Sequence, residues 1–375
     1  MIVRPVQSRR DLGSFVDLPV RLHRGTPGFV APLRMTELET LDPNRNPFFR
    51  HARVETFLAE RDGRPVGRVA VIDDDLHNER HGDDLAFFGF FDAADAEAAG
   101  ALLATAEDRA RALGRSLLRG PANPSMNDSA GLQIDAFERP PFVMMPWNPP
   151  SYRPWIEAHG FAKIKDLHAW TADEANGIPE RFGRLAARAS QRSGAVVREL
   201  RTDRWDEELA TVQRIYTEAW EQNWGQVSYT DAEFAHLAAS LKMIVDPRIA
   251  LFVETGGEVV GVCLGLPDLN QVLARFHGRL VPFGVVPLLR RKAIIDQLRL
   301  AILGVLPAYR NRGLELVLIH EVWTRGVAAG YHRAELSWIL EDNEPIAKGL
   351  RALGAEITKT YRLYQKPLKG PAESA

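Results

Sequence analysis

The sequence lacks several features that would narrow its function at once. Only one of its 375 residues is a cysteine, Cys263, so no disulfide forms within the chain and a cytoplasmic setting is expected. The 47 Lys and Arg residues are balanced by 49 Asp and Glu residues, which gives no basic surplus to favour a nucleic-acid partner. No apolar run approaches the roughly twenty residues that span a bilayer, and the first residues lack the apolar core of a signal peptide. The ten histidines are scattered without metal-ligand spacing, so we expect no bound metal.

A strand–turn–helix segment near the C-terminus is the most informative part of the chain. The apolar run Leu303–Leu306 predicts a buried strand, and the spacing of apolar residues predicts a helix from Leu314 to Ala329. The turn between them carries Arg310, Arg312 and Gly313. A helix N-terminus offers unpaired backbone N–H groups and the positive end of the helix dipole, and a glycine lets a phosphate come close to the backbone. The segment therefore predicts an anion site.

This turn resembles motif A of the GNAT acyltransferases, Gln/Arg-x-x-Gly-x-Gly/Ala, which holds the pyrophosphate of coenzyme A. The sequence departs from the motif at its last small residue, where Glu315 places a carboxylate near the expected phosphate. The family's asparagine that contacts the pantetheine arm matches Asn343, and Leu353-Gly354-Ala355 matches its Leu-Gly-Phe close. The family's frequent tyrosine falls on Leu350, so a tyrosine general acid is not expected there. The resemblance implies that CoA or acyl-CoA contacts Val305, Leu306, Arg310, Asn311, Arg312, Gly313, Leu314 and Asn343.

The sequence contains the same pattern of predicted strands and helices twice, which indicates a repeated fold. The hairpin pattern of Phe57–Val69 recurs at Phe252–Val262, and the apolar strand Phe87–Phe91 recurs at Ile302–Leu306. Together with the family resemblance, this predicts an α/β fold of two tandem GNAT-like domains, each a twisted, mostly antiparallel mixed sheet flanked by helices. We place a degenerate domain at residues 1–175 and the acyl-CoA-binding domain at 176–375. Two unrelated α/β halves are the alternative.

The two copies differ in charge at the position of motif A. The first copy has Asp92, Asp95 and Glu97 there, which suit the capping of a helix N-terminus and would repel a pyrophosphate. The second copy has two arginines. The chemistry is therefore expected in the C-terminal half.

Two further segments are candidates for the acceptor side. Trp220 and Trp224 stand four residues apart, which predicts that they share one helix face, either as core or as an aromatic wall for an apolar acceptor. An insertion beginning at Pro267 contains Asp268 and Asn270 and ends in an apolar stretch with three cations, which is typical of an interfacial segment or a lid. The residues expected to contact the acceptor are Trp220, Trp224 and Asn270. The cations Arg290, Arg291 and Lys292 predict peripheral contact with an anionic membrane at its inner face.

The segments Pro267–Gln271 and Gly120–Asn123 are similar to those of a group of bacterial tandem GNAT proteins that includes bacterial ceramide synthases. This resemblance implies an acyl-CoA-dependent N-acyltransferase that transfers a long-chain acyl group to a sphingoid base or another lipid amine. Glu341 and Asp268 are the candidate bases. The alternatives are a small-molecule N-acetyltransferase and a non-catalytic GNAT pair that binds a ligand or partner, which the Glu315 departure favours. Aminoacyl transfer from tRNA is disfavoured by the charge balance.

Overall fold

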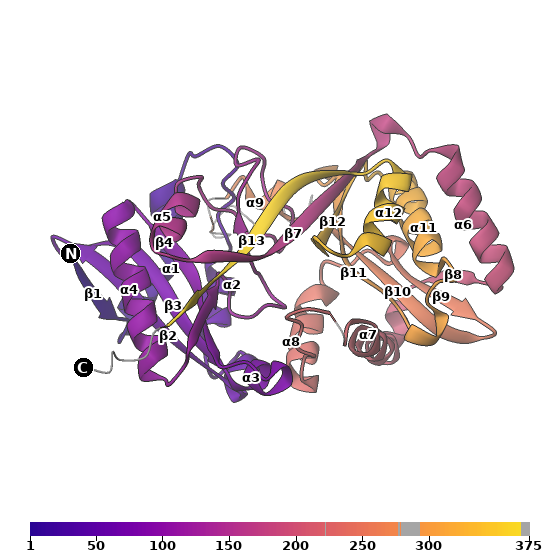
Figure 1. Cartoon of the computed structure of the whole chain (residues 1–375). Helices are drawn as coiled ribbons and strands as arrows, with labels where there is room; N and C mark the ends of the chain where they lie inside the picture. Colours follow the sequence, from indigo (N-terminus) through magenta and orange to yellow (C-terminus); the bar gives the residue numbers. More distant parts are fainter. Residues whose placement is uncertain (222, 277, 279–292, 369–375) are drawn as a thin grey trace. The chain divides into compact units, whose positions relative to one another are not determined.

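The computed structural model describes residues 1–221, 223–276, 278 and 293–368. The chain divides into two compact units, which are described separately (Figure 1). The first unit contains Met1–Leu167, Leu273–Val286 and Lys359–Ala375, and the second contains His168–Val272 and Pro287–Thr358. Each unit therefore includes chain from both halves of the sequence. The predicted domain boundary between residues 175 and 176 stays a prediction.

The first unit is a mixed sheet with helices on both of its faces. Its strands are β1 (Ile2–Pro5), β2 (Ala52–Arg61), β3 (Arg64–Asp74), β4 (Leu85–Ala93), β5 (Leu117–Gly120), β6 (Leu132–Gln133), β7 (Ala162–Asp173), which continues into the second unit, and the end of β13 (Glu356–Pro367). Its helices are α1 (Arg9–His23), α2 (Arg34–Thr40), α3 (Asp75–His81), α4 (Ala96–Ala112) and α5 (Tyr152–Ala158). The sheet order within this unit is β1-β2-β3-β4-β5-β13, and only β4 and β5 pair in parallel.

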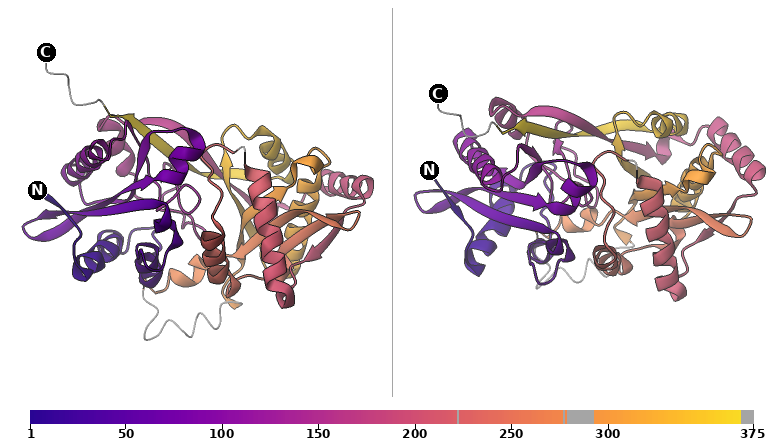
Figure 2. Two further views of the ribbon diagram at one scale, coloured as in Figure 1. Left: turned by 90° about the horizontal axis from the view of Figure 1, so that it is seen from below. Right: turned by 60° about the horizontal axis from the view of Figure 1, so that its bottom comes forward.

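Alternation along β3 explains the two layers of helices. Val69 and Val71 belong to the core that contains the buried face of α4, whereas Ala70 and Ile72 belong to the core that contains the buried face of α1. Successive side chains of a strand point to opposite faces of the sheet, so a strand that is apolar at every position is buried on both. Figure 2 shows the same arrangement from two other sides.

The second unit repeats this plan. Its remaining strands are β8 (Val196–Glu199), β9 (Ala250–Thr255), β10 (Glu258–Pro267), β11 (Gln297–Val305) and β12 (Arg333–Leu340), paired in the order β12-β11-β10-β9-β8. Its helices are α6 (Glu180–Ser193), α7 (Trp205–Trp220), α8 (Asp231–Lys242), α9 (Asn270–Leu273), α11 (Leu314–Ala328) and α12 (Glu344–Leu353). The sheet is covered by α7 on one face and by α11 on the other (Figure 1). None of the helices in the described part of the chain is long and apolar enough to cross a membrane.

The repeat predicted from the sequence is present in both units. The antiparallel hairpin β2–β3 corresponds to β9–β10, and the parallel pair β4–β5 corresponds to β11–β12. A helix connects the two strands of each parallel pair, α4 in the first unit and α11 in the second. The predicted fold class, two GNAT-like units of mixed and mostly antiparallel sheet flanked by helices, is confirmed.

The carboxylates at the end of β4 have different roles. Asp95 is the N-cap of α4 and accepts from the Ala98 N–H at 2.9 Å, as predicted. Asp92 does not cap the helix, because it is still within β4 and is buried. Its carboxylate accepts hydrogen bonds from Arg68 at 2.7 Å and from the Tyr152 hydroxyl at 3.2 Å. Burial raises the pKa of Asp92, but Arg68 and the hydrogen bond from His23 bring it below its usual range.

Replacing Tyr152 with phenylalanine is expected to lower the free energy of unfolding by about 1–3 kcal/mol. The hydroxyl accepts the Ala93 N–H at 3.0 Å and contacts Asp92 and the His23 ring, so its loss removes the partner of the Ala93 N–H and one hydrogen bond from Asp92 and from His23. Denaturant unfolding measures the change. The matched control is Tyr309→Phe, whose hydroxyl donates to Glu258 at the surface and whose loss is expected to change stability by less than about 0.5 kcal/mol. Equal effects of the two substitutions would contradict this account of the buried cluster.

Candidate functional site

The predicted anion turn joins β11 to α11 in the second unit. The short 3-10 turn Pro307–Tyr309 follows β11, and Gly313 is the N-cap of α11 with a left-handed backbone, φ 79°. Asn311 is also left-handed, at φ 62°. The first intrahelical bond of α11 runs from the Val317 N–H to the Gly313 carbonyl at 3.2 Å. The N–H groups before Val317 therefore have no carbonyl partner within the helix, as an anion site requires.

The two arginines of the turn differ in what they contact. The Arg310 guanidinium donates to the carbonyl of Ala219 at 2.5 Å, so it ties the turn to the C-terminal end of α7. Arg312 is exposed, and its guanidinium lies over the ring of Tyr309 at 4.8 Å from the centroid. Among the residues that the structure describes, no carboxylate pairs with Arg312. Its charge is therefore available to a phosphate.

Glu315 opposes an anion at this helix end. It is half-buried in the first turn of α11. Burial raises the pKa of Glu315, and its own backbone N–H and the charge of Arg310 offset only part of that rise. A phosphate that approaches the helix N-terminus therefore meets a negative charge that must be displaced or protonated.

Replacing Glu315 with glutamine is expected to tighten CoA binding about three- to tenfold, because a repulsive charge is removed from the helix end. In the wild-type protein the repulsion is fully present above the raised pKa of Glu315 and is lost as the pH falls through that pKa. Calorimetric titration over a range of pH measures both effects. The phosphates of CoA titrate equally in both proteins, so the difference between the two profiles isolates Glu315. A glutamine variant with unchanged affinity at neutral pH would rule out the repulsion.

The parallel pair β11–β12 parts beside this turn. Its register runs from Gln297 with Arg333 to Leu300 with Leu336, whereas β11 continues to Val305. The last five residues of β11 are therefore not paired with β12, and we call the gap on this side of β11 the opening.

Backbone alternation fixes which N–H groups point into this opening. The N–H of Leu306 donates to the Val260 carbonyl at 2.9 Å, toward β10. Neighbouring residues of a strand present their backbone groups to opposite edges, so the N–H of Val305 points toward the open edge. The Leu303 carbonyl faces the same way and accepts from the Trp220 indole at 3.3 Å. The opening thus presents a backbone donor next to the side chain of Trp220.

The corresponding opening in the first unit is filled by the chain itself. The Ala122 N–H donates to the Phe88 carbonyl at 3.0 Å, and Asn123 Oδ1 accepts from the Phe90 N–H. Phe90 is the position that corresponds to Val305 in the repeat. A Cβ on Gly89 would lie 1.6 Å from the Ala122 oxygen, so only glycine permits this approach. The Asn123 side-chain carbonyl therefore takes the place that a substrate carbonyl would need.

The candidate bases lie at different ends of the sheet. Because β12 runs parallel to β11, Glu341, which follows β12, lies at the same end as the turn. Asp268 follows β10, which pairs Pro267 with Leu298 at the start of β11. Seven residue steps separate Leu298 from Val305, about 23 Å of strand. Asn270 begins α9 beside Asp268 and shares its position far from the turn. Asn343 is the N-cap of α12 at the near end.

One premise about the tryptophans is wrong. α7 ends at Trp220, so Trp224 lies in the following turn and does not share its helix face. The left-handed Gly225, φ 70°, stands directly after it. The proposed roles of both side chains in acceptor binding stay predictions. The predicted basic segment with Arg290, Arg291 and Lys292 lies outside the described residues.

Sequence reasoning missed a buried polar cluster where the two strands part. Arg299 donates to Ser337 Oγ at 3.0 Å, and the Ser337 hydroxyl donates to Glu335 at 2.8 Å. Arg299 and Glu335 are directly paired across the strands. The spacing of Glu335 and Ser337 by two residues was the available signal, since it places both on one face of β12. Among the described residues there is no group of three or more metal-ligating side chains arranged to hold a metal ion.

A parallel strand pair that parts beside a glycine-containing turn at a helix N-terminus defines the GNAT class of acyltransferases. A tandem GNAT protein from the clavulanic acid biosynthesis pathway has the same fold, with a TM-score of 0.59, 15% identity and 99% of both chains covered. A GCN5-related N-acetyltransferase from Sphaerobacter thermophilus gives a TM-score of 0.52 at 15% identity and covers 98% of this chain and 96% of that one.

Relatives with higher sequence identity identify the family. A bacterial ceramide synthase from Caulobacter vibrioides is 38% identical over 374 residues, which is 98% of this chain and 97% of that protein. Protein YghO from Escherichia coli is 31% identical over 375 residues, 98% of this chain and 95% of that protein. No family model matches the chain. The chain belongs to the tandem GNAT N-acyltransferases that include this bacterial ceramide synthase, and it is an N-acyltransferase.

Proposed function

We propose that the second unit transfers a long-chain acyl group from acyl-CoA to the nitrogen of a lipid amine such as a sphingoid base. The observation that carries this proposal is the opening beside β11, where the Val305 N–H points to an unpaired strand edge next to the turn with Arg312. In the first unit Asn123 fills the corresponding opening, so the residues described there leave no comparable place for a substrate carbonyl. The likeness to a relative named for ceramide synthesis supports the lipid acceptor.

The residues of the turn fit the phosphates of CoA. Arg312 supplies a charge without a carboxylate partner among the described residues, Gly313 permits close approach, and the first N–H groups of α11 supply donors. Glu315 opposes this fit. Arg310 contributes by holding the turn against α7.

The opening supplies the two groups that acyl transfer to an amine requires. The Val305 N–H donates to the thioester oxygen, on which negative charge develops as the nitrogen attacks. Glu341 accepts the proton that the amine loses. The new C–N bond forms, the C–S bond breaks, and CoA leaves as the thiolate, which becomes the thiol by taking up the proton that Glu341 accepted. Trp220 lies on the acceptor side of the opening, where its indole holds the Leu303 carbonyl.

An acyl-transfer assay tests the proposal directly. The protein is incubated with palmitoyl-CoA and a sphingoid base, free CoA thiol is followed with a thiol reagent, and the amide is identified by mass spectrometry. Formation of the amide in step with release of thiol is the expected result. Equal turnover of acetyl-CoA with small polar amines would favour a small-molecule acetyltransferase. Binding of CoA without turnover of any amine would contradict the proposed activity.

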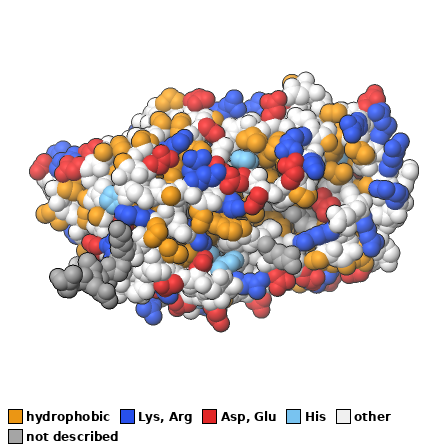
Figure 3. All heavy atoms as spheres, in the orientation of Figure 1, with side chains coloured by type: hydrophobic (Ala, Val, Ile, Leu, Met, Phe, Trp, Pro, Cys, Tyr) orange, Lys and Arg blue, Asp and Glu red, His pale blue; other side chains and the backbone are white. Residues whose placement is uncertain are grey.

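We also propose contact with an anionic membrane. Among the described residues, a row of exposed arginines on α6 supports it. Arg181, Arg184, Arg188 and Arg192 repeat at intervals of three and four residues, which places them on one helix face. All four are exposed, and Lys and Arg side chains line the edge of Figure 3 where Figure 1 labels α6. Arg184 pairs with Glu180 at 2.8 Å, whereas the other three have no carboxylate partner among the described residues. A row of exposed cations favours an anionic surface.

Replacing Arg181, Arg188 and Arg192 with serine is expected to reduce co-sedimentation with phosphatidylglycerol vesicles at least about fivefold, since each arginine near such a surface contributes about 1 kcal/mol. Wild-type binding is expected to fall as salt is raised from 0.1 M, where the Debye length is about 10 Å, to 1 M, where it is about 3 Å. The control variant removes three exposed arginines of the first unit, Arg10, Arg24 and Arg64. Equal losses in both variants, or no binding by the wild type, would exclude α6 as a membrane contact.

A further inference from the structure

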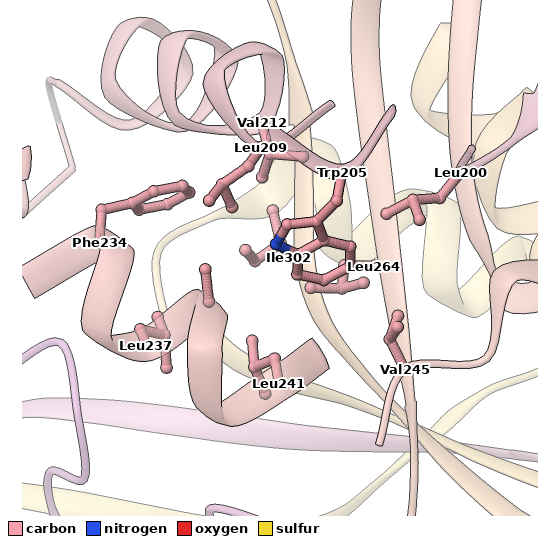
Figure 4. A pocket seen from close by; sticks show the side chains of 11 residues that line it. Leu200, Trp205, Leu209, Val212, Phe234, Leu237, Leu241, Val245, Leu264 and Ile302 are labelled. Carbon is pink, nitrogen blue, oxygen red and sulfur yellow. The ribbon is translucent and has the colours of Figure 1, made fainter. Parts of the chain in front are cut away.

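The second unit contains an apolar pocket between α7, α8 and the sheet. It is partly open to solvent. In Figure 4, Leu209 and Val212 of α7 face Phe234, Leu237 and Leu241 of α8. The indole of Trp205 projects into the space between the helices (Figure 4). The complete lining is Leu200, Trp205, Leu209, Val212, Phe234, Leu237, Ala238, Leu241, Val245, Leu264 and Ile302.

The lining of this pocket carries almost no polar groups. Apart from the Trp205 indole, every side chain that lines the pocket is a hydrocarbon. Such a pocket offers nothing to a sugar, a phosphate or a polar amine, because each would lose its hydrogen bonds to water on entry. A hydrocarbon chain loses no hydrogen bonds there and gains the full benefit of leaving water. The lining therefore selects for an alkyl chain.

The pocket shares strand β11 with Val305, where the donor carbonyl is proposed to bind. Ile302 stands on the part of β11 that β12 leaves unpaired, and Val305 is three residue steps further along the same strand. That separation is about 10 Å, which is spanned by roughly eight carbon–carbon bonds of an extended chain. An acyl chain whose carbonyl is held at Val305 thus reaches the pocket only when it is longer than about eight carbons.

We propose that the pocket between α7 and α8 binds the distal half of the fatty-acyl chain of the donor, and so sets a minimum acyl length. This inference rests on the proposed use of acyl-CoA by the second unit. Leu241 of α8 lines this pocket, so a larger side chain there fills part of the space that an alkyl chain would occupy.

The test compares a pocket-filling variant with a matched surface variant of the same helix. Leu241→Trp adds an indole to the lining of the pocket, and Ala239→Trp adds the same group at an exposed position of α8. Affinities for CoA, butyryl-CoA and palmitoyl-CoA are measured by calorimetry for each protein. We expect palmitoyl-CoA to bind the wild type at least about tenfold more tightly than butyryl-CoA. Leu241→Trp is expected to abolish that difference while CoA affinity is unchanged, and Ala239→Trp is expected to preserve it.

The possible outcomes distinguish a failure of the pocket assignment from a failure of the proposed function. If CoA does not bind any of the proteins, the proposed function fails. If CoA binds but palmitoyl-CoA gains nothing over butyryl-CoA, or if Leu241→Trp leaves the gain intact, the assignment of the pocket is overturned and the proposed use of acyl-CoA stands. If the variant instead changes only the KM for amines of different alkyl length, the pocket binds the acceptor and the donor assignment is wrong.

Discussion

Replacing Arg312 with glutamate is expected to weaken CoA binding by at least about 2 kcal/mol, roughly thirtyfold, because the change removes a charge-assisted contact and adds repulsion. Arg312 is exposed beside Gly313 and stacks on Tyr309, with no carboxylate partner among the described residues. Its guanidinium donates to the Ala308 carbonyl at 3.3 Å, and its charge, which no described carboxylate neutralises, is available to a phosphate. The loss is expected to shrink as salt is raised, since an exposed contact is screened.

A charge-matched control separates this contact from the general field of the protein. Arg64 is the exposed first residue of β3 in the first unit, and Arg64→Glu changes the net charge by the same amount. Calorimetry is expected to show unchanged CoA affinity for this control. A small loss in Arg312→Glu, or an equal loss in both variants, would mean that Arg312 does not contact the cofactor.

Replacing Glu341 with glutamine is expected to reduce kcat at least about a hundredfold while the affinity for CoA stays within about twofold of the wild type. Glutamine keeps the size of the side chain but cannot accept the proton of the attacking amine. The parallel register of β11 and β12 places Glu341 at the end of the sheet that carries the turn, which is why we favour it over Asp268. Steady-state kinetics with palmitoyl-CoA and a sphingoid base measure the effect.

Two neighbouring carboxylates provide controls for this substitution. Glu344 lies in the first turn of α12, where Arg351 already engages its carboxylate at 2.8 Å, so Glu344→Gln is expected to retain most of the activity. Asp268→Asn tests the other candidate base, far along the strands from the turn. A rate loss confined to Asp268→Asn would transfer the role of base to that residue and would contradict the placement of the reaction at Val305.

Local patterns predicted much of the fold. The hairpins at Phe57–Val69 and Phe252–Val262 formed as expected, because a turn with glycine between apolar strands specifies its own pairing. The turn before α11 formed because Gly313 accepts the left-handed backbone that its N-cap requires. The family resemblance supplied the fold class, two tandem units of mixed sheet flanked by helices, which no single pattern contains.

Features that depend on contacts between distant residues were not predictable. Nothing in the sequence around Asn123 indicates that its side chain accepts from the Phe90 N–H, because the two meet only after β4 and β5 have paired. The pocket arises from residues of six elements or connecting segments, and the apolar faces of α7 and α8 read equally well as close-packed core. The four-residue spacing predicts Trp224 on the same helix as Trp220, but such spacing does not mark where a helix ends, and α7 ends at Trp220.

The central claim is that the chain binds one CoA, in the second unit, at the turn before α11. Native mass spectrometry of the protein titrated with CoA tests it most directly. The account predicts a single CoA per chain for the wild type and for Arg64→Glu, and its loss at the same concentration for Arg312→Glu. Two CoA molecules per chain, or one that persists in Arg312→Glu, would contradict the assignment of the site to the second unit.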